Sequence, residues 1–278
     1  MNVYIDKEEL GSIAIARTMK AIKTHAPGGV HFVDSAKSSN LIILNVVGRL
    51  KHLGIKIRDF NKPYIIIQYA QKSTLNPNPN DWLHVWKDAR LVWSYYDLGK
   101  FGRFNFYRSP LGVDSAFKRH QTAKEYVIAT SGVGYLQESV RECIHAARKV
   151  NRRVFHVGPI FKELPEIDFS NGMGDADLAK KYSACEFVSG LRRYEGFEFP
   201  VIEGFVCGAR PICFDAPHYR QWFNDFAIFI PKVSRDEIVN HLIEIFKSHQ
   251  KPVTDKEILE VRRRFDWKKI VDGFWKHI

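Results

Sequence analysis

The chain has 278 residues, 45% of them hydrophobic, which is enough to bury one large core or two of ordinary size. Lys and Arg number 42 against 31 Asp and Glu, a net charge of +11. The residues after Met1, NVYIDKEELGS, carry charges where a signal peptide needs an apolar stretch, and no window approaches the roughly 18 apolar residues of a membrane span. We therefore expect a soluble, unsecreted, cytoplasmic protein.

Short apolar runs alternate with helical patterns along the whole chain. Such runs suit buried parallel strands, and the segments between them suit crossover helices. In chain order, strands are predicted at 3–5, 41–47, 64–70, 90–96, 126–130, 153–158, 185–190 and 210–215. Helices are predicted at 13–23, at 135–150 and at 200–207, and capping boxes of Ser234 with Glu237 and Thr254 with Glu257 begin the last helices. The alternation predicts an α/β architecture with parallel sheets.

A polar stretch, FYRSPLGVDSAFKRHQTAKE, interrupts this alternation and contains Pro110 and Gly112. We place a domain boundary there, giving domains at 1–118 and 119–278, the second including the C-terminal helix. Residues 1–118 hold 17 basic and 9 acidic side chains, a net charge of +8, which leaves +3 for the rest. Such a field favours a polyanionic partner, either nucleic acid or an anionic membrane surface.

The spacing of the cysteines and histidines does not match the ligand patterns of metal sites. The cysteines at 143, 185, 207 and 213 form no CxxC pair and lie in apolar patterns, so we predict reduced, packed thiols. The eleven histidines show neither HxxxH nor HxH spacing. No Ser-His-Asp set is evident either.

The segment RRYEGFEFPVIEGFVCGARPICFD carries two carboxylates eight residues apart, Glu195 and Glu203. It follows a strand end, and Pro200 is suited to the first residue of a short helix that ends before Gly208. Glu195 then lies in the loop and Glu203 one turn into the helix, while loop amides approach the helix N-terminus, which attracts anions. Carboxylates accept hydrogen bonds from sugar hydroxyls, and amides bind phosphates. We predict a site for a nucleotide sugar at the carboxyl ends of the strands.

EGFEFPVIEGFVCGARPICFD resembles the E-x7-E segment of retaining GT-B glycosyltransferases of the family 4 type, whose usual form is close to EGFGLPVLEAMACGTPVV. Weaker similarities are FYRSPLGVDSAF to the interdomain segment, HVGP to the strand end before the nucleotide pocket, and FDWKKIVDGF to the closing helix. The resemblance implies two Rossmann-like domains with parallel sheets facing a cleft. It also implies a nucleotide-sugar donor (UDP- or GDP-sugar) on the second domain, an acceptor on the first, no metal, and retention of anomeric configuration.

Carried over to this sequence, the resemblance implies that Glu195 binds hydroxyls of the transferred sugar as the catalytic candidate and that Glu203 binds the ribose. Backbone N–H groups for the donor would come from Gly196, Phe197, Glu198 and Phe199. The alternative is that both glutamates are solvated charges of a loop and a helix.

Three departures from the family pattern stand out, and the first is that Glu198 replaces a usual glycine. Secondly, the loop ATSGVGYLQESV lacks the Arg and Lys that usually clamp the diphosphate. Gly132, Gly134 and the next helix N-terminus are candidates to supply amides instead. A charge is expected from Arg192, Arg193 or Lys162, although both arginines are equally well interpreted as solvated.

The third departure concerns the acceptor side, where Gln68 and Tyr69 stand in place of a usual histidine. Gly11 and Ser12 resemble the family's first glycine-bearing turn, and a helix cap without a ligand is the alternative.

The acceptor is open to several interpretations. A hydroxymethylated base in DNA, flipped out toward the donor, is our first hypothesis, and a glycan or lipid carrier at an anionic membrane is the rival. A non-catalytic nucleotide-sugar or nucleic-acid binding module is the third. A chain this short for the family suggests a viral or phage origin, and hence the host cytoplasm. The basic residues that could contact DNA are Lys72, Arg103 and Arg108. The aromatic residues that could stack on bases, or that simply fill the core, are Trp82, Trp86, Trp93, Tyr95 and Tyr96.

Overall fold

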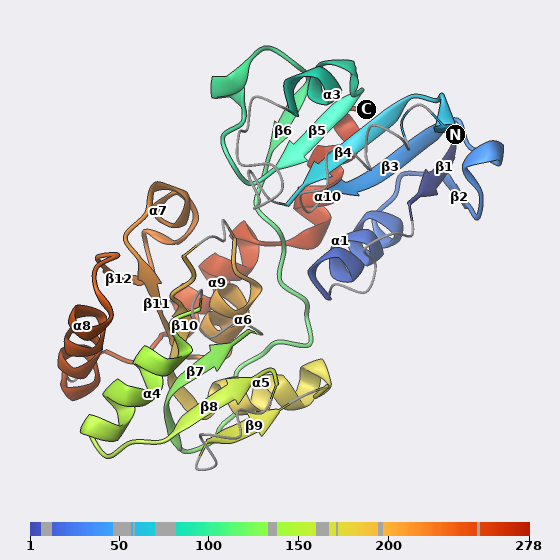
Figure 1. Cartoon of the computed structure of the whole chain (residues 1–278). Helices are drawn as coiled ribbons and strands as arrows, with labels where there is room; N and C mark the ends of the chain where they lie inside the picture. The colour runs from blue at the N-terminus through green and yellow to red at the C-terminus, as the bar shows by residue number, and fades with distance from the viewer. Residues whose placement is uncertain are drawn as a thin grey trace. The chain divides into compact units, whose positions relative to one another are not determined.

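A computed structural model describes most of the chain (Figure 1). The described residues are 1–6, 13–46, 57, 59–69, 82–132, 138–159, 167–170, 172–193, 197–248 and 251–278. They form two compact units, of which unit 1 comprises residues 1–112 and 265–278 and unit 2 comprises residues 113–264. The chain thus divides six residues before the expected boundary, and the C-terminal helix, expected in the second domain, belongs to unit 1.

Unit 1 is built on a six-stranded parallel sheet, sheet A, with strand order β2-β1-β3-β4-β5-β6. Its elements are β1 (Asn2–Ile5), α1 (Ile13–Thr24), β2 (His31–Val33), β3 (Leu41–Val46), β4 (Tyr64–Gln68), α3 (Leu83–Asp88), β5 (Leu91–Ser94), β6 (Phe106–Arg108) and α10 (Trp267–Lys276). Central strands β3, β4 and β5 are buried on both faces, which explains their continuous apolar runs.

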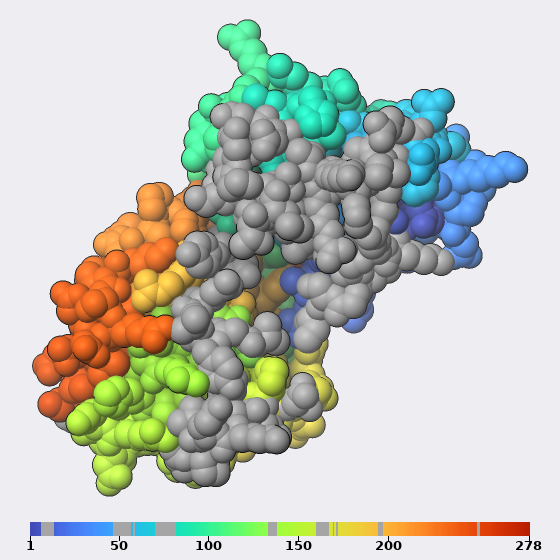
Figure 2. All heavy atoms as spheres, viewed as in Figure 1, coloured from blue at the N-terminus to red at the C-terminus, as the bar shows by residue number. Residues whose placement is uncertain are grey.

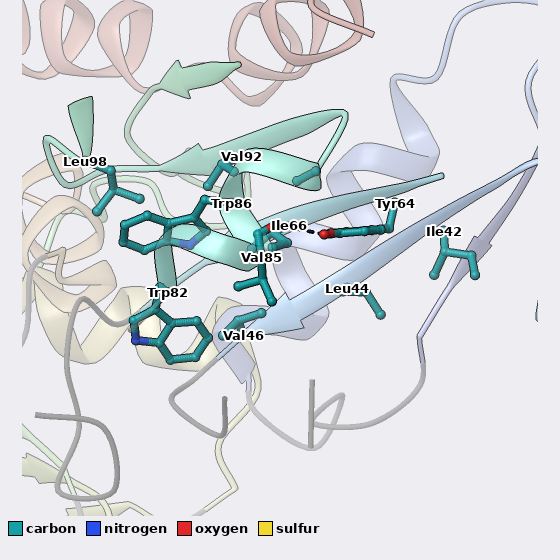
Figure 3. Packing of buried hydrophobic residues seen from close by; sticks show 11 residues of the cluster. Ile42, Leu44, Val46, Tyr64, Ile66, Trp82, Val85, Trp86, Val92 and Leu98 are labelled. Carbon is teal, nitrogen blue, oxygen red and sulfur yellow. Dashed lines mark hydrogen bonds between the residues drawn. The ribbon is translucent and has the colours of Figure 1, made fainter. Parts of the chain in front are cut away.

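The core of unit 1 lies between sheet A and α3 (Figure 3). Trp82 and Trp86 stack there with ring centroids 6.4 Å apart, and Tyr64 donates a hydrogen bond to the carbonyl of Val85 at 2.8 Å. On another side of the sheet, Trp93 packs on Phe274 of α10 at 5.2 Å. This apolar contact explains why the last helix joins the first unit although it follows the second in sequence.

Unit 2 is built on sheet B, also parallel, with strand order β12-β11-β10-β7-β8-β9. Its elements are β7 (Tyr126–Ser131), α4 (Val140–Lys149), β8 (Val154–Val157), β9 (Asp168–Ser170), α5 (Asp175–Ser183), β10 (Cys185–Gly190), α6 (Phe199–Val206), β11 (Arg210–Phe214), α7 (Pro217–Phe223), β12 (Ile228–Ile230), α8 (Arg235–Lys247) and α9 (Asp255–Arg264). Helices α4 and α8 pack side by side and form one continuous surface (Figure 2).

All eight strands and the helices predicted from sequence are present, and both capping boxes form. The four strands that were not predicted, β2, β6, β9 and β12, are the edge strands of the two sheets, and each has three residues. Edge strands are short and partly solvated, so they lack the apolar run that marks a central strand. The four cysteines are free and buried, as expected.

Helix α6 packs closely against β10 through Gly204. A Cβ atom on Gly204 would lie 2.7 Å from the Cβ of Val188, a contact that the rigid valine cannot relieve. We expect Gly204→Ala to lower the free energy of unfolding by about 1–3 kcal/mol, because overpacking outweighs the roughly 1 kcal/mol gain in helix propensity. Urea unfolding at pH 7 measures the change.

The matched control is Gly28→Ala, because nothing lies within 4 Å of a Cβ built there and its φ is not positive. This control should stay within about 0.5 kcal/mol of the parent chain. A Gly204→Ala protein as stable as the parent would contradict the close packing of α6 on β10.

Candidate functional site

The strand order of sheet B reverses between β7 and β10. From β7 the chain proceeds outward to β8 and β9, and then returns to β10 and proceeds outward to β11 and β12. In open parallel sheets, ligands bind outside the carboxyl ends of the strands at this switch point. The segments that border the switch point are Ser131–Gly132 at the end of β7 and Leu191–Arg193 after β10.

Arg192 joins three segments at this edge of sheet B. Its Nε lies 2.9 Å from Oε2 of Glu198, just before α6, and its Nη1 lies 3.2 Å from Oε1 of Glu138, just before α4. Its Nη2 donates to Oγ of Ser131 at 3.3 Å. The hydroxyl of Tyr219 on α7 completes the cluster with contacts of 3.4 Å to the Arg192 carbonyl and 3.5 Å to Oε1 of Glu198.

The cluster holds one guanidinium against two carboxylates. Glu138 is 9% exposed and Glu198 is 3% exposed, so both ion pairs are largely shielded from water. The positive charge of Arg192, one of the candidates for binding the diphosphate, is thus already balanced by these two carboxylates. The glutamate at the usual glycine position has an explanation as well, since its side chain turns to Arg192. Glu138 was missed from sequence, because no local spacing connects it with Arg192.

Arg193 presents the other guanidinium of this loop. Its side chain is half-buried and lies over the ring of Phe214 at the carboxyl end of β11, with the guanidinium carbon 5.4 Å from the ring centroid. Its carbonyl accepts a hydrogen bond from Lys232 at 2.8 Å. Within the part of the chain that the structure describes, no carboxylate pairs with Arg193. Of the two arginines, Arg193 therefore has the less compensated charge.

Gly132 lies at the end of β7 with φ of 133°, where a side chain is strained. A Cβ there would lie 1.9 Å from Oε2 of Glu138, so the carboxylate occupies the space that a side chain would need. The Gly132 N–H donates to the carbonyl of Val157 at 3.0 Å. This amide, expected to bind a donor, is already paired, and a phosphate would have to replace that bond.

Glu203 lies on α6 and is only 3% exposed. The alternative interpretation as a solvated helix charge therefore does not hold for Glu203. Phe197 and Phe199 pack edge to face with centroids 6.1 Å apart, and Phe197 also packs on Phe223, which anchors the approach to α6. The predicted site residues Glu195, Gly196, Gly134 and Lys162 lie outside the described residues.

The acceptor-side candidates Gln68 and Tyr69 lie at the end of β4 in unit 1, where both side chains are buried. Oε1 of Gln68 accepts a hydrogen bond from Nε1 of Trp86 at 3.3 Å, and the Tyr69 hydroxyl donates to Oδ1 of Asn45 at 3.3 Å. Burial raises the pKa of Tyr69, so its hydroxyl stays protonated. Gly11 and Ser12 lie outside the described residues.

The aromatic side chains considered for stacking are mostly core. Trp82, Trp86, Trp93 and Tyr95 are buried, whereas Tyr96 is half-buried. Arg108 lies 3.8 Å from Asp97, Arg103 is exposed, and Lys72 lies outside the described residues. On unit 1, an acceptor would therefore be bound by positive charge rather than by stacking on these aromatic side chains.

His156, in the HVGP motif on β8, is fully buried, and its Nδ1 lies 2.8 Å from Oγ1 of Thr130. Burial lowers its pKa to about 4, and the positive charge of Arg192 contributes to the same shift. The folded pKa thus lies below the ordinary value of 6.5, so the unfolded chain binds the proton more tightly.

The contribution of neutral His156 to the free energy of unfolding should therefore be fully present above about pH 6.5. It should fall by an amount on the order of 3 kcal/mol as the pH decreases toward 4. In His156→Gln that part of the pH dependence should vanish, whereas in His145→Gln, which changes an exposed histidine, it should persist. Urea unfolding at pH 7, 5.5 and 4.5 measures both. Equal pH dependence in His156→Gln and the parent would refute the shift.

No protein-family model and no curated protein matches this sequence. The fold, by contrast, has many counterparts among solved structures. Anabaena HepE in complex with UDP-glucose superposes with a TM-score of 0.71 at 14% identity, over 99% of this chain and 98% of that one. Sucrose-phosphate synthase from Thermosynechococcus elongatus superposes with a TM-score of 0.67 at 15% identity, over 98% of this chain and 79% of that one.

The pneumococcal O-GlcNAc transferase GtfA, in complex with UDP and GlcNAc, gives a TM-score of 0.64 at 16% identity. The similarity covers 85% of this chain but spans only 56% of the GtfA chain. In this chain the similarity covers two units, each built on a six-stranded parallel sheet. The expectation of fold class is confirmed: the chain has the GT-B fold.

Proposed function

We propose that this protein is a glycosyltransferase that binds a nucleotide sugar, with UDP-sugars as the donor class, at the carboxyl edge of sheet B. The observation that carries the proposal is the switch point between β7 and β10, where the Arg192 cluster and the start of α6 meet. The complexes of HepE with UDP-glucose and of GtfA with UDP and GlcNAc support it, because both proteins share the fold.

In this proposal the E-x7-E segment binds the donor. Glu203 accepts a hydrogen bond from the ribose, Glu195 binds hydroxyls of the sugar, and amides from Gly196 to Phe199 bind the diphosphate. Arg193 supplies the positive charge, because Arg192 is compensated by two carboxylates. Lys162 is the other cation that the sequence offers for this role.

We infer a retaining transfer of the family 4 type. Electrostatic stabilisation would act on an oxocarbenium-like sugar while amides and arginine stabilise the leaving phosphate. Activity should then not require a metal ion. No cluster of three metal-ligating side chains is found among the described residues.

For the acceptor we infer a polyanion or a polyanionic surface, on the charge of residues 1–118 alone. A hydroxymethylated base in DNA is the first candidate, and a glycan or lipid carrier at an anionic membrane is the second. In the described part of the chain no helix is long and apolar enough to cross a bilayer.

A second candidate function is a nucleotide-sugar binder without transfer. The observation that favours it is the pairing of Arg192 with Glu138 and Glu198, which removes one expected diphosphate clamp. Slow hydrolysis of UDP-glucose without an acceptor separates the two functions, because a transferase activates the anomeric bond and a binder does not.

We expect Glu203→Gln to weaken UDP-glucose binding about 10- to 100-fold, because it replaces a charged acceptor of the ribose hydrogen bond with a neutral one. Calorimetric titration of the folded variant measures the Kd. The matched control is Glu142→Gln, which neutralises another buried glutamate, one that pairs with Arg235 on α8, and should leave the Kd within about twofold.

The same titration on Glu198→Gln has the opposite expected sign. Loss of one carboxylate leaves Arg192 paired with Glu138 alone, so the local charge rises by one unit and UDP-glucose should bind several-fold more tightly. If the Kd is unchanged in both Glu203→Gln and Glu198→Gln, the proposal that the donor binds at this edge of sheet B is wrong.

For the acceptor, affinity for duplex DNA should fall with salt. If residues 1–118 neutralise about 4–6 phosphates, log K should fall against log salt with a slope of roughly −4 to −5. Gel shifts from about 50 to 200 mM salt measure this slope, and Arg103→Gln should reduce it by about 1 if this exposed arginine contacts a phosphate. Binding to anionic liposomes with no measurable DNA affinity would favour the membrane acceptor.

A further inference from the structure

The amino ends of the strands in sheet B meet at the edge opposite the switch point. A cavity of about 440 Å³ opens there, between the starts of β10 and β11 and residues 248 and 251–253 after α8. Apolar side chains, among them Phe187 and Phe246, also line it. Six basic side chains line it: Arg119, Lys124, Arg152, Arg210, Lys247 and Lys251.

Three of these cations have carboxylate partners. Arg152 pairs with Glu186, the acidic residue of the cavity wall. The other two arginines pair with α9, Arg119 with Asp255 at 3.1 Å and Arg210 with Glu257 at 2.9 Å.

Among the described residues, the six cations exceed their three paired carboxylates by three positive charges, on Lys124, Lys247 and Lys251, and Glu186 also attracts Lys124. No ion pair to any of the three lysines occurs among the described residues.

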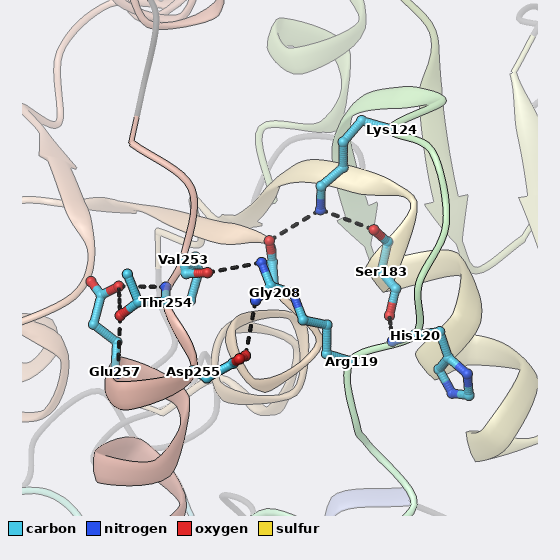
Figure 4. A network of polar contacts seen from close by, with 9 residues as sticks. All are labelled: Arg119, His120, Lys124, Ser183, Gly208, Val253, Thr254, Asp255 and Glu257. Atoms are coloured by element: carbon cyan, nitrogen blue, oxygen red, sulfur yellow. Dashed lines mark hydrogen bonds and ion pairs between the residues drawn. The ribbon is translucent and has the colours of Figure 1, made fainter.

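Lys124 is held at the wall of this cavity by main-chain groups (Figure 4). Its Nζ donates to the carbonyls of Ser183 at 2.9 Å, Cys185 at 2.6 Å and Gly208 at 3.1 Å. Burial lowers its pKa, and the charge of Arg119 acts in the same direction. A lysine in this condition is stabilised by a nearby anion, since the anion compensates the charge that burial penalises.

The wall next to Lys124 is rigid. Arg119 donates from Nη2 to the carbonyl of Val253 at 2.8 Å, and its Nε lies 2.9 Å from where a Cβ of Gly208 would be. Gly208 has φ of 93°, a conformation that favours glycine. These contacts connect the segment 119–124 to the start of α9, so Arg119 and Lys124 are preorganised (Figure 4).

We propose that this cavity is a second binding site, for a phosphate group of a small ligand. Its volume falls within the range of small-molecule sites, about 300–1,000 Å³, and phosphate matches an excess of lysine and arginine donors. The six residues of β10 span roughly 16 Å, so this site is separate from the carboxyl edge of the sheet. The proposal does not depend on the function proposed for that edge.

The test is thermal unfolding and calorimetric titration of the whole chain with sodium phosphate, compared with sodium chloride at equal ionic strength. Phosphate should raise the Tm in a saturable manner, as expected for a ligand of the folded state. In the double variant Lys247→Gln/Lys251→Gln the Kd for phosphate should rise about 10-fold or more. Both lysines are exposed, so this variant should fold normally.

The matched control is Lys20→Gln/Lys149→Gln, which removes the same charge from exposed lysines outside the cavity and should leave the Kd unchanged. The phosphate effect should also persist in Glu203→Gln, which separates this site from the donor site. Equal phosphate affinity in the cavity variant and the parent, or no saturable effect in the parent, would overturn the proposal.

Two further probes separate the sources of the phosphate. Glucose 6-phosphate in solution and phosphatidylcholine vesicles containing phosphatidic acid each present a phosphomonoester. A site for a soluble ligand should bind glucose 6-phosphate in competition with free phosphate and leave the vesicles unbound. Vesicle binding that requires Lys247 and Lys251, without competition by glucose 6-phosphate, would contradict a small soluble ligand.

Discussion

The ion pairs of Arg192 set the geometry of the carboxyl edge of sheet B, on which the rest of the candidate site depends. One guanidinium connects the ends of β7 and β10 with the segments that begin α4 and α6. Two of its partners, Glu138 and Glu198, are nearly buried, and removal of the arginine would break both ion pairs, at a cost of about 3–5 kcal/mol. The loops around the switch point are therefore held by these ion pairs together with the packing of Phe197 on Phe199 and Phe223.

The same ion pairs change the electrostatics that a donor would meet. A diphosphate needs positive charge and amides, but the Arg192 cluster carries one positive and two negative charges, and the Gly132 amide is bonded within sheet B. Arg193, stacked on Phe214, is the guanidinium of this loop that is not compensated by a described carboxylate. A donor site of this composition would depend more on the helix N-terminus and on Arg193 than the family pattern does.

The two edges of sheet B differ in charge. At the carboxyl edge the Arg192 cluster has two carboxylates for one guanidinium and Arg193 adds one positive charge, whereas at the amino edge the described cations of the cavity exceed their paired carboxylates by three. In a parallel sheet both edges are surrounded by loops and helix ends, which can carry charges without disturbing the apolar interior. The protein thus has room for two ligand sites on one unit. The basic field of residues 1–118 is a separate feature, and its aromatic side chains serve the core.

The sequence by itself determined the class of fold, the eight central strands, the helices with their capping boxes and the short helix that carries Glu203. Each of these is a local pattern of apolar periodicity, proline placement or side-chain capping, so neighbouring residues suffice to predict it. Only the tertiary structure decided the edge strands, the return of α10 to the first unit, the partners of Arg192 and the basic cavity at the amino edge. The physical reason is that these features join segments far apart in the chain. Glu138 lies 54 residues before Arg192, and the cavity collects cations between positions 119 and 251, so their distance and burial follow from how the strands assemble.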